Sequence, residues 1–296
     1  MTLLGILFAL LLERVVEKVR GWREHRWLAD YYQWMQRKLG SSSFWSGPGG
    51  VMMVHVPLVV AVGLVFGVLN AVFFGFLSFI AGVGVLLMCL GPRDLDADTD
   101  AFLDAVVESD DSAMQARAEE ILGKKPADLN DRVIIEGVFS ESLERTFGVL
   151  FWFSILGPVG AVLFRVSSQM QIMAKKSDEE KEGFVKAARR LHSILLWLPA
   201  RLLALGFAVV GNFEDALHNW RTCADEFEGD WVESGRQVVK AAGCGAMRLD
   251  TMPEDETAES ARFDTGKIRS AMALVWRTLV VWVVVILIMT LAGLAG

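Results

Sequence analysis

The fold is decided by residues 51–90, which have the sequence VMMVHVPLVVAVGLVFGVLNAVFFGFLSFIAGVGVLLMCL. These forty positions contain no Asp, Glu, Lys or Arg, and only His55 and Cys89 have ionisable side chains. One helix needs about 20 apolar residues to cross the roughly 30 Å hydrocarbon core of a bilayer. The stretch is about twice that long and therefore predicts a hairpin of two membrane-spanning helices.

Three other apolar stretches follow along the chain. Residues 278–296 are uncharged and predict a C-terminal membrane helix. Residues 148–164 are also uncharged but contain Gly157-Pro158-Val159-Gly160, and residues 194–210 contain Pro199. A break in a membrane helix requires protein or water to satisfy the freed backbone groups. Both stretches are expected to be broken near these residues, and either re-entrant or fully spanning.

The composition supports a membrane protein with polar parts. The chain has 296 residues, of which 53% are hydrophobic and 22% are charged, whereas soluble domains average about 45–50% apolar residues. The first apolar segment, residues 3–12, has no basic n-region and no small-residue cleavage site, so we expect an uncleaved membrane helix. Cys89, Cys223 and Cys244 are widely spaced without a Cys-x-x-Cys pair, which excludes a zinc ribbon and gives no sign of a disulfide framework.

The distribution of Lys and Arg predicts the orientation, because basic loops tend to stay in the cytoplasm. Residues 17–46 contain six basic and three acidic side chains, so this loop should be cytoplasmic and the N-terminus periplasmic. Residues 170–190 contain six basic and four acidic side chains and also look cytoplasmic. A full span at residues 148–164 would place them on the other side, which favours a re-entrant element there.

The polar segments show the periodicity of short helices. Apolar residues recur at helical spacing within residues 102–122, with an interruption at residues 109–112 and a stop at Gly123, and a second helix is predicted at about 129–147. Further helical pieces are predicted around 213–227 and 232–247, followed by a loose acidic linker at 251–265.

These features together predict an all-α, polytopic helical membrane protein with broken or re-entrant helices and cytoplasmic helical segments. Its expected organisation comprises five segments. They are residues 1–91 (N-terminal membrane helix, basic cytoplasmic loop and transmembrane hairpin), 92–147 (acidic cytoplasmic helical segment), 148–211 (broken membrane helices with the Gly-Pro element), 212–269 (cytoplasmic helical segment and acidic linker) and 270–296 (C-terminal transmembrane helix).

Several motifs between about Ala113 and Met247 occur in a known family. They are Leu150-Phe151-Trp152, then GPVGAVLFR at residues 157–165, and WLPARL at residues 197–202. In these motifs and their spacing the chain resembles the CbiB/CobD membrane synthases of cobalamin biosynthesis, which use ATP to join an aminopropanol unit to adenosylcobyric acid. At the N-terminus, Met1-Thr2-Leu3, Glu13-Arg14 and the Arg-, His- and Trp-rich sequence that follows are similar to the AmpE family of inner-membrane proteins.

The chain departs from the synthase pattern where an ATP-dependent ligase needs metal ligands, phosphate contacts and proton carriers. Glu136 is kept, but the Asn-Thr-Leu-Asp of the synthases is Ser168-Gln169-Met170-Gln171 here, and their Asp-Asp pair is His192-Ser193. The resemblance therefore implies that the scaffold is kept and the ligase chemistry is lost. No catalytic residue and no cofactor is expected.

The candidate site consists of charged residues near the two interrupted apolar stretches. An Arg at membrane depth needs an anionic partner or must extend to the headgroups. We therefore predict a polar ligand pocket at the membrane face, with structural ion pairs as the alternative, and we expect the Gly-Pro element and Pro199 to have a structural or gating role. The pocket residues are Arg165, Arg201, Glu136, Glu141 and Glu144, and the structural or gating residues are Gly157, Pro158, Gly160 and Pro199.

Other charged residues have simpler interpretations. Glu13 and Arg14 are expected to form an ion pair at the membrane interface or to contact another membrane helix, and Arg277 should extend to the headgroups. Asp94, Asp96, Asp98 and Asp100 do not fit a calcium loop and predict a solvated helix start. The four histidines lack ligand spacing, so no metal is expected. The basic, aromatic residues 22–38 favour anchoring at the interface rather than nucleic-acid binding.

The resemblance implies an AmpE-type role, which is that of a regulatory or signalling protein associated with β-lactamase induction, the antibiotic response and peptidoglycan recycling. A protein of this type is expected to be a non-enzyme rather than an enzyme. The competing class is a membrane enzyme, either an amide ligase related to adenosylcobinamide-phosphate synthase or an enzyme acting on a cell-wall or lipid intermediate. The expected partners are membrane lipids, a protein partner or second copy, and a cell-wall-derived small molecule. The expected location is the bacterial inner membrane, with several passes and mainly cytoplasmic polar segments.

Overall fold

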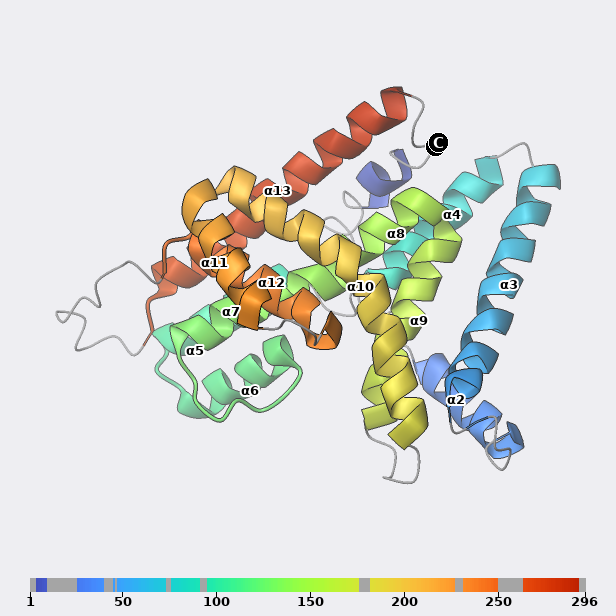
Figure 1. Cartoon of the computed structure of the whole chain (residues 1–296), viewed down its shortest axis with the longest axis horizontal. Coiled ribbons are helices and arrows are strands. Elements are labelled where there is room, and N and C mark those ends of the chain that lie inside the picture. The colour runs from blue at the N-terminus through green and yellow to red at the C-terminus, as the bar shows by residue number, and fades with distance from the viewer. Residues whose placement is uncertain are drawn as a thin grey trace. The chain divides into compact units, whose positions relative to one another are not determined.

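In the computed structural model of the chain, the described residues form a series of helices (Figure 1). It describes residues 4–9, 26–39, 45, 47–72, 76–90, 95–175, 182–226, 231–249 and 263–292. These ranges contain no strand, and the chain is an all-α, polytopic membrane protein, as the sequence predicts.

The helices follow the order of the chain. Residues 4–9 are helical within the predicted first apolar helix, whereas Glu13, Arg14 and most of the predicted linker at 251–265 lie outside the described residues. The elements are α2 (Arg26–Leu39), α3 (Pro48–Val72), α4 (Phe76–Cys89), α5 (Leu95–Val107), α6 (Asp111–Leu122), α7 (Asp131–Ser142), the π-helix η2 (Leu143–Phe147), α8 (Gly148–Leu156), α9 (Pro158–Lys175), α10 (Glu182–Val210), α11 (Phe213–Glu226), α12 (Trp231–Ala246) and α13 (Thr265–Leu291).

Among the described residues, three helices are long and apolar enough to cross a bilayer. They are α3 between Pro48 and Ala71, α10 and α13. The predicted hairpin is present as α3 and α4, which pack on each other. At 14 residues α4 is about 21 Å long, which is shorter than the roughly 30 Å hydrocarbon core. The predicted C-terminal helix is present as α13, which begins several residues earlier than its uncharged part.

The chain forms two compact units. The first unit comprises Met1–Pro92, Gly148–Leu196 and Ile286–Gly296, and the second comprises Arg93–Phe147 and Trp197–Val285. Two helices, α10 and α13, contribute residues to both units. The division into five segments that the sequence suggests stays a prediction.

The first unit is built around α9, which packs on α3, α4 and α8. An aromatic cluster joins the surrounding elements, because Phe184 at the start of α10 stacks on Trp45 and tilts against Tyr32 of α2, both with ring centroids 5.7 Å apart. All three side chains are buried. The aromatic residues of α2 therefore contribute to the core of this unit as well as to any anchoring at the membrane interface.

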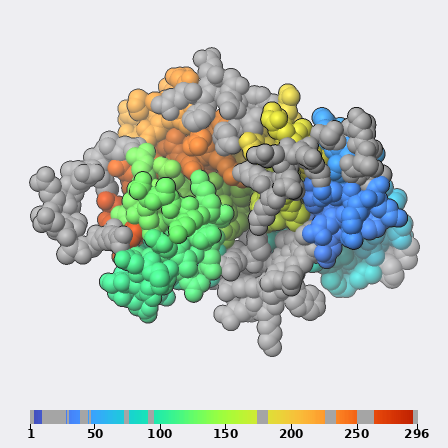
Figure 2. Space-filling model, turned by 90° about the horizontal axis from the view of Figure 1, so that it is seen from below, coloured from blue at the N-terminus to red at the C-terminus, as the bar shows by residue number. Residues whose placement is uncertain are grey.

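The second unit contains the predicted polar helices. α5 packs on α6, α6 on α7, and α12 on both α7 and α11, and Figure 2 shows the green residues of α5–α7 against the orange residues of α11 and α12. The predicted interruptions are confirmed, because Asp110 caps the start of α6 and Gly123 ends it in a left-handed conformation with φ 66°. Glycine adopts this conformation at little cost because it has no Cβ atom.

The predicted break in the Gly-Pro element is confirmed at Gly157. This residue has φ 63°, a conformation that costs an L side chain energy, and it separates α8 from α9. Pro158 occupies the first position of α9, where a missing N–H is tolerated. A Cβ at Gly160 would overlap the carbonyl oxygen of Trp152, so the close packing of α9 on α8 requires glycine there.

The predicted break near Pro199 is wrong. α10 continues from Glu182 to Val210 with Pro199 inside it. A proline has no N–H for the carbonyl four residues earlier, which here belongs to Leu195. The indole Nε1 of Trp152 donates a hydrogen bond to this carbonyl at 2.9 Å. A side chain from α8 thus replaces the missing donor, and the helix needs no break.

This replacement predicts coupling between Trp152 and Pro199. We expect Trp152→Phe to lower the free energy of unfolding by about 1–3 kcal/mol, because it leaves a carbonyl without a donor. The loss should be much smaller in a Pro199→Ala background, where the residue 199 N–H can reach the Leu195 carbonyl. Thermal or denaturant unfolding of the four proteins in detergent measures the coupling. Additive effects of the two substitutions would contradict it.

Candidate functional site

The predicted pocket residues fall in both units. Arg165 belongs to the first unit, whereas Glu136, Glu141, Glu144 and Arg201 belong to the second. A pocket shared by all five residues therefore stays a prediction. The contacts within each unit show what surrounds each residue.

Arg165 caps a helix within the first unit. It lies on α9 with 4% of its surface exposed, and its Nε donates to the carbonyl of Cys89 at 2.6 Å. Cys89 is the last residue of α4, and the last carbonyls of a helix have no partner within it. A cation is also favourable at a helix C-terminus. Part of the role of Arg165 is thus to join α9 to the end of α4.

The three glutamates on α7 and η2 all have basic partners. Glu136 accepts from Arg132 at 3.0 Å and lies 3.8 Å from Lys240 of α12. Glu141 accepts from Arg145 at 2.9 Å, and Glu144 accepts from Arg236 of α12 at 3.0 Å. These contacts agree with the alternative prediction for the three glutamates, in which they form structural ion pairs rather than line a ligand pocket.

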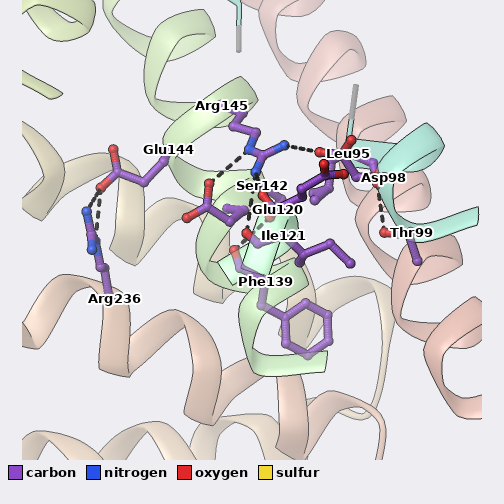
Figure 3. A network of polar contacts seen from close by, with 11 residues as sticks. Leu95, Asp98, Thr99, Glu120, Ile121, Phe139, Ser142, Glu144, Arg145 and Arg236 are labelled. Carbon is purple, nitrogen blue, oxygen red and sulfur yellow. Dashed lines mark hydrogen bonds and ion pairs between the residues drawn. The ribbon is translucent and has the colours of Figure 1, made fainter. Parts of the chain in front are cut away.

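Arg145 is the centre of a buried network that the sequence did not suggest (Figure 3). Besides Glu141, its guanidinium binds Asp98 of α5 at 2.8 Å and donates to the carbonyl of Glu120 at 3.1 Å, in the last turn of α6. Burial alone would lower the pKa of Arg145, but the Glu141 and Asp98 carboxylates outweigh it and raise that pKa above its ordinary value. Arg145 thus joins α5, α6 and α7 as a permanent cation.

The network lies on a π-helix. η2 contains both Glu144 and Arg145, whose side chains form ion pairs with different elements, α12 and α5. π-helical turns are rare and occur frequently at functional sites. An α-helical register would rotate the two residues relative to α7. The π-turn therefore allows adjacent residues to satisfy two separate partners.

The prediction of a solvated acidic cluster at residues 94–100 is wrong for Asp98. α5 does begin at Leu95, with Asp96 and Asp98 in its first turn, but Asp98 is buried because it pairs with Arg145. The partner lies 47 residues away in the chain, so local pattern could not reveal it. The one available signal was that Asp98 shares a helical face with the apolar Phe102 and Ala105.

Arg201 has a different environment from the acids. Its guanidinium carbon lies 4.0 Å from the centroid of the Trp197 ring, and its Nη1 donates to the Trp197 carbonyl at 3.2 Å. Within the described residues it has no acidic partner. It therefore stays a candidate for binding an anion.

Asp131 joins the starts of two helices in the second unit. Its Oδ2 accepts from the backbone N–H of Asp264, which precedes α13, at 2.9 Å. Its Oδ1 is buried and has no hydrogen-bond partner in the described part of the chain. Burial, and to a smaller extent the charge of Asp264, raises the pKa of Asp131.

The sequence matches the model of a known protein family. The family model described as CobD/Cbib protein matches residues 6–273. The chain belongs to the CobD/CbiB family. Among the described residues, no group of three or more His, Cys, Asp or Glu side chains is arranged to hold a metal ion.

Individual relatives share different parts of the chain. The cobalamin biosynthesis protein CobD of Chromobacterium violaceum is 31% identical over 58% of this chain and 55% of its own length. CobD of Stutzerimonas stutzeri is 28% identical over 71% of this chain and 75% of its own length. The protein AmpE of Shigella flexneri is 23% identical over 99% of both chains. No solved structure matches the chain. The alignment thus spans about half of the first of these CobD proteins, and AmpE is a weaker but end-to-end match.

The buried ion pair between Arg145 and Asp98 predicts that replacing Arg145 strongly destabilises the fold. We expect Arg145→Gln to lower the free energy of unfolding by about 3–5 kcal/mol, because it leaves the Asp98 carboxylate buried without its cation. The matched control is Arg117→Gln, which removes an exposed ion pair with Glu120 and should change stability by at most about 0.5 kcal/mol. Denaturant unfolding in detergent measures both, and equal losses would contradict the assignment.

Asp131 predicts a pH dependence of opposite sign to that of an ordinary paired carboxylate. Because its folded pKa is raised, the native state binds more protons than the unfolded state between the ordinary pKa of 3.8 and the raised value. Its contribution to stability should therefore be fully present below pH 3.8 and be lost as the pH rises through the folded pKa. Subtracting the unfolding curves of Asp131→Asn from those of the unmodified protein over pH 3.5–7 isolates this term. A flat difference would contradict the prediction.

Proposed function

We propose that this chain is an AmpE-type regulatory protein of the bacterial inner membrane, which has the CobD/CbiB scaffold without the amide-forming reaction. The main observation in favour is that the three glutamates of α7 and η2 are paired with basic side chains. An ATP-dependent ligase needs carboxylates that are free to hold the metal ions that bind the ATP phosphates, whereas Glu136, Glu141 and Glu144 are bound to Arg or Lys. The end-to-end similarity to AmpE and the replaced motifs at residues 168–171 and 192–193 support the same interpretation.

The second candidate is an amide synthase of cobalamin biosynthesis. It is favoured by the family match and by the higher identity of the CobD proteins, which support it more directly than the 23% identity to AmpE supports regulation. Against it stand the lost polar motifs. A carboxylate would have to leave its basic partner before it could bind a metal ion, and for the buried Glu144 the loss of Arg236 would cost about 3–5 kcal/mol.

The regulatory mechanism that we propose uses the hinge at Gly157. A cell-wall-derived small molecule or a protein partner would favour one angle between α8 and α9, because the chain has few helical restraints where the left-handed Gly157 separates them. The predicted topology belongs to the same proposal: a basic cytoplasmic loop after the first helix and a periplasmic N-terminus.

Two deletion strains distinguish the candidates. In a strain lacking its AmpE, expression of this chain should restore the β-lactamase response to a β-lactam. In a strain lacking the cobalamin synthase, it should not restore growth that depends on making cobalamin from its precursors. Rescue of the second strain, with no effect in the first, would overturn the proposal in favour of the synthase.

A matched pair of glycine variants tests the hinge. Gly157→Ala places a side chain at φ 63° and should weaken the restored response, because a left-handed L residue costs about 1–2 kcal/mol. The control is Gly67→Ala on α3, where a Cβ would have no neighbour within 4 Å. Immunoblotting of membranes verifies that both variants accumulate. An equal response from both would remove Gly157 from the mechanism.

A further inference from the structure

The C-terminal part of α10 has an exposed face that is apolar apart from one cation. Its exposed large apolar residues within the second unit are Trp197, Leu198, Leu202, Leu205 and Val209. At about 100° per residue these positions fall within an arc of about 140°, and Arg201 lies inside the same arc. The face has the composition expected of a surface in contact with lipid, except for its single guanidinium.

A guanidinium on such a face requires an anion. Charged side chains are costly in lipid unless they are paired or reach the headgroups. The described contacts of Arg201 use one N–H group, which donates to the Trp197 carbonyl, and one ring face, which is that of Trp197. Arg has five N–H donors, so most remain available. Within the described residues no carboxylate supplies the missing charge.

The geometry favours a phosphate as that anion. The Trp197 ring holds one face of the planar guanidinium, which leaves the N–H edge free for the two parallel hydrogen bonds that Arg forms with phosphate oxygens. Trp197 itself is 42% exposed, as tryptophans at the level of lipid headgroups often are. Ring and cation together therefore match the chemistry of a lipid headgroup.

The apolar part of the face matches the rest of a lipid molecule. Leu202, Leu205 and Val209 continue along the helix from Arg201 over about 12 Å, at 1.5 Å per residue. A molecule that places an anion at Arg201 and hydrocarbon along these residues would cover the whole arc. Charge complementarity and lipid as the surrounding solvent thus favour the same occupant.

We propose that Arg201 and Trp197 form a binding site for the phosphate of an anionic phospholipid, whose acyl chain lies along Leu202, Leu205 and Val209. The site goes beyond the proposed function and does not depend on whether the chain is a regulator or a synthase. It would give α10 a fixed depth relative to the headgroups.

Native mass spectrometry of the purified full chain with phosphatidylglycerol tests the site. We expect Arg201→Gln to weaken the first lipid-binding event by about tenfold, in line with the loss of charge-assisted hydrogen bonds. Arg201→Lys should be intermediate, because it keeps the charge but loses the planar fork. Trp197→Leu should weaken binding several-fold. The unmodified protein should bind phosphatidylglycerol more tightly than phosphatidylcholine. Arg201→Gln should bind the two lipids equally.

The matched control is Arg277→Gln. Arg277 is also an exposed arginine on an apolar helix, α13, and donates to the carbonyl of Ala273 four residues earlier. Arg277 is also expected to reach the headgroups, but within the described residues no aromatic ring lies against its guanidinium, so Arg277→Gln should weaken the first binding event by far less than tenfold. Thermal unfolding in lipid-free detergent verifies that the variants are folded. Two results would overturn the proposal: unchanged lipid binding in Arg201→Gln, or an equal loss in Arg277→Gln. A change in self-association or in a co-purifying protein, with lipid binding intact, would also overturn it by assigning Arg201 to a protein contact.

Discussion

The structure depends on one constraint of the bilayer: backbone polar groups in lipid must find partners within the protein. The hydrogen bond from Trp152 to the Leu195 carbonyl meets this constraint where Pro199 removes the normal donor. It also links two of the motifs shared with the CobD/CbiB family, because Trp152 ends the first and Pro199 lies in the third. In this chain the two motifs are thus connected physically, since the indole of α8 supplies the donor that the proline of α10 lacks.

Local signals in the sequence predicted most of the helices and their ends. The break at Gly157, the interruption at residues 109–112 and the stop at Gly123 all depend on residues within one turn, and the structure has them where they were expected. The errors have the opposite character. Continuity through Pro199 depends on Trp152, which lies 43 positions before the Leu195 whose carbonyl it binds. The burial of Asp98 depends on Arg145, which lies 47 positions away. A pattern analysis of a single chain contains neither contact.

The candidate site was predicted in its residue types but not in its partners. The glutamates around α7 were predicted either to line a ligand pocket or to form structural ion pairs, and they bind Arg132, Arg145 and Arg236. The ligand pocket stays a prediction. The burial of Arg145 was not predicted, because this residue follows a glutamate in a mixed polar sequence. Such a sequence ordinarily indicates a solvated ion pair. Only the π-turn of η2 and the packing of α5 bring Arg145 into the interior. Buried pairs of this kind are weak evidence for stability, but they specify which helices meet.

The charges of the second unit therefore divide into two groups with different consequences. Around Arg145 and Glu144, each cation has a carboxylate, so the network can hold helices together without any ligand. At Arg201 the cation has an aromatic ring and a carbonyl, which orient it but cannot neutralise it. A residue that the fold orients without neutralising has to obtain its counter-charge from outside the described chain. On a helix face that is otherwise apolar, an anionic lipid can supply that charge, and this is the physical reason for proposing Arg201, rather than the acids of α7, as the residue that binds a ligand.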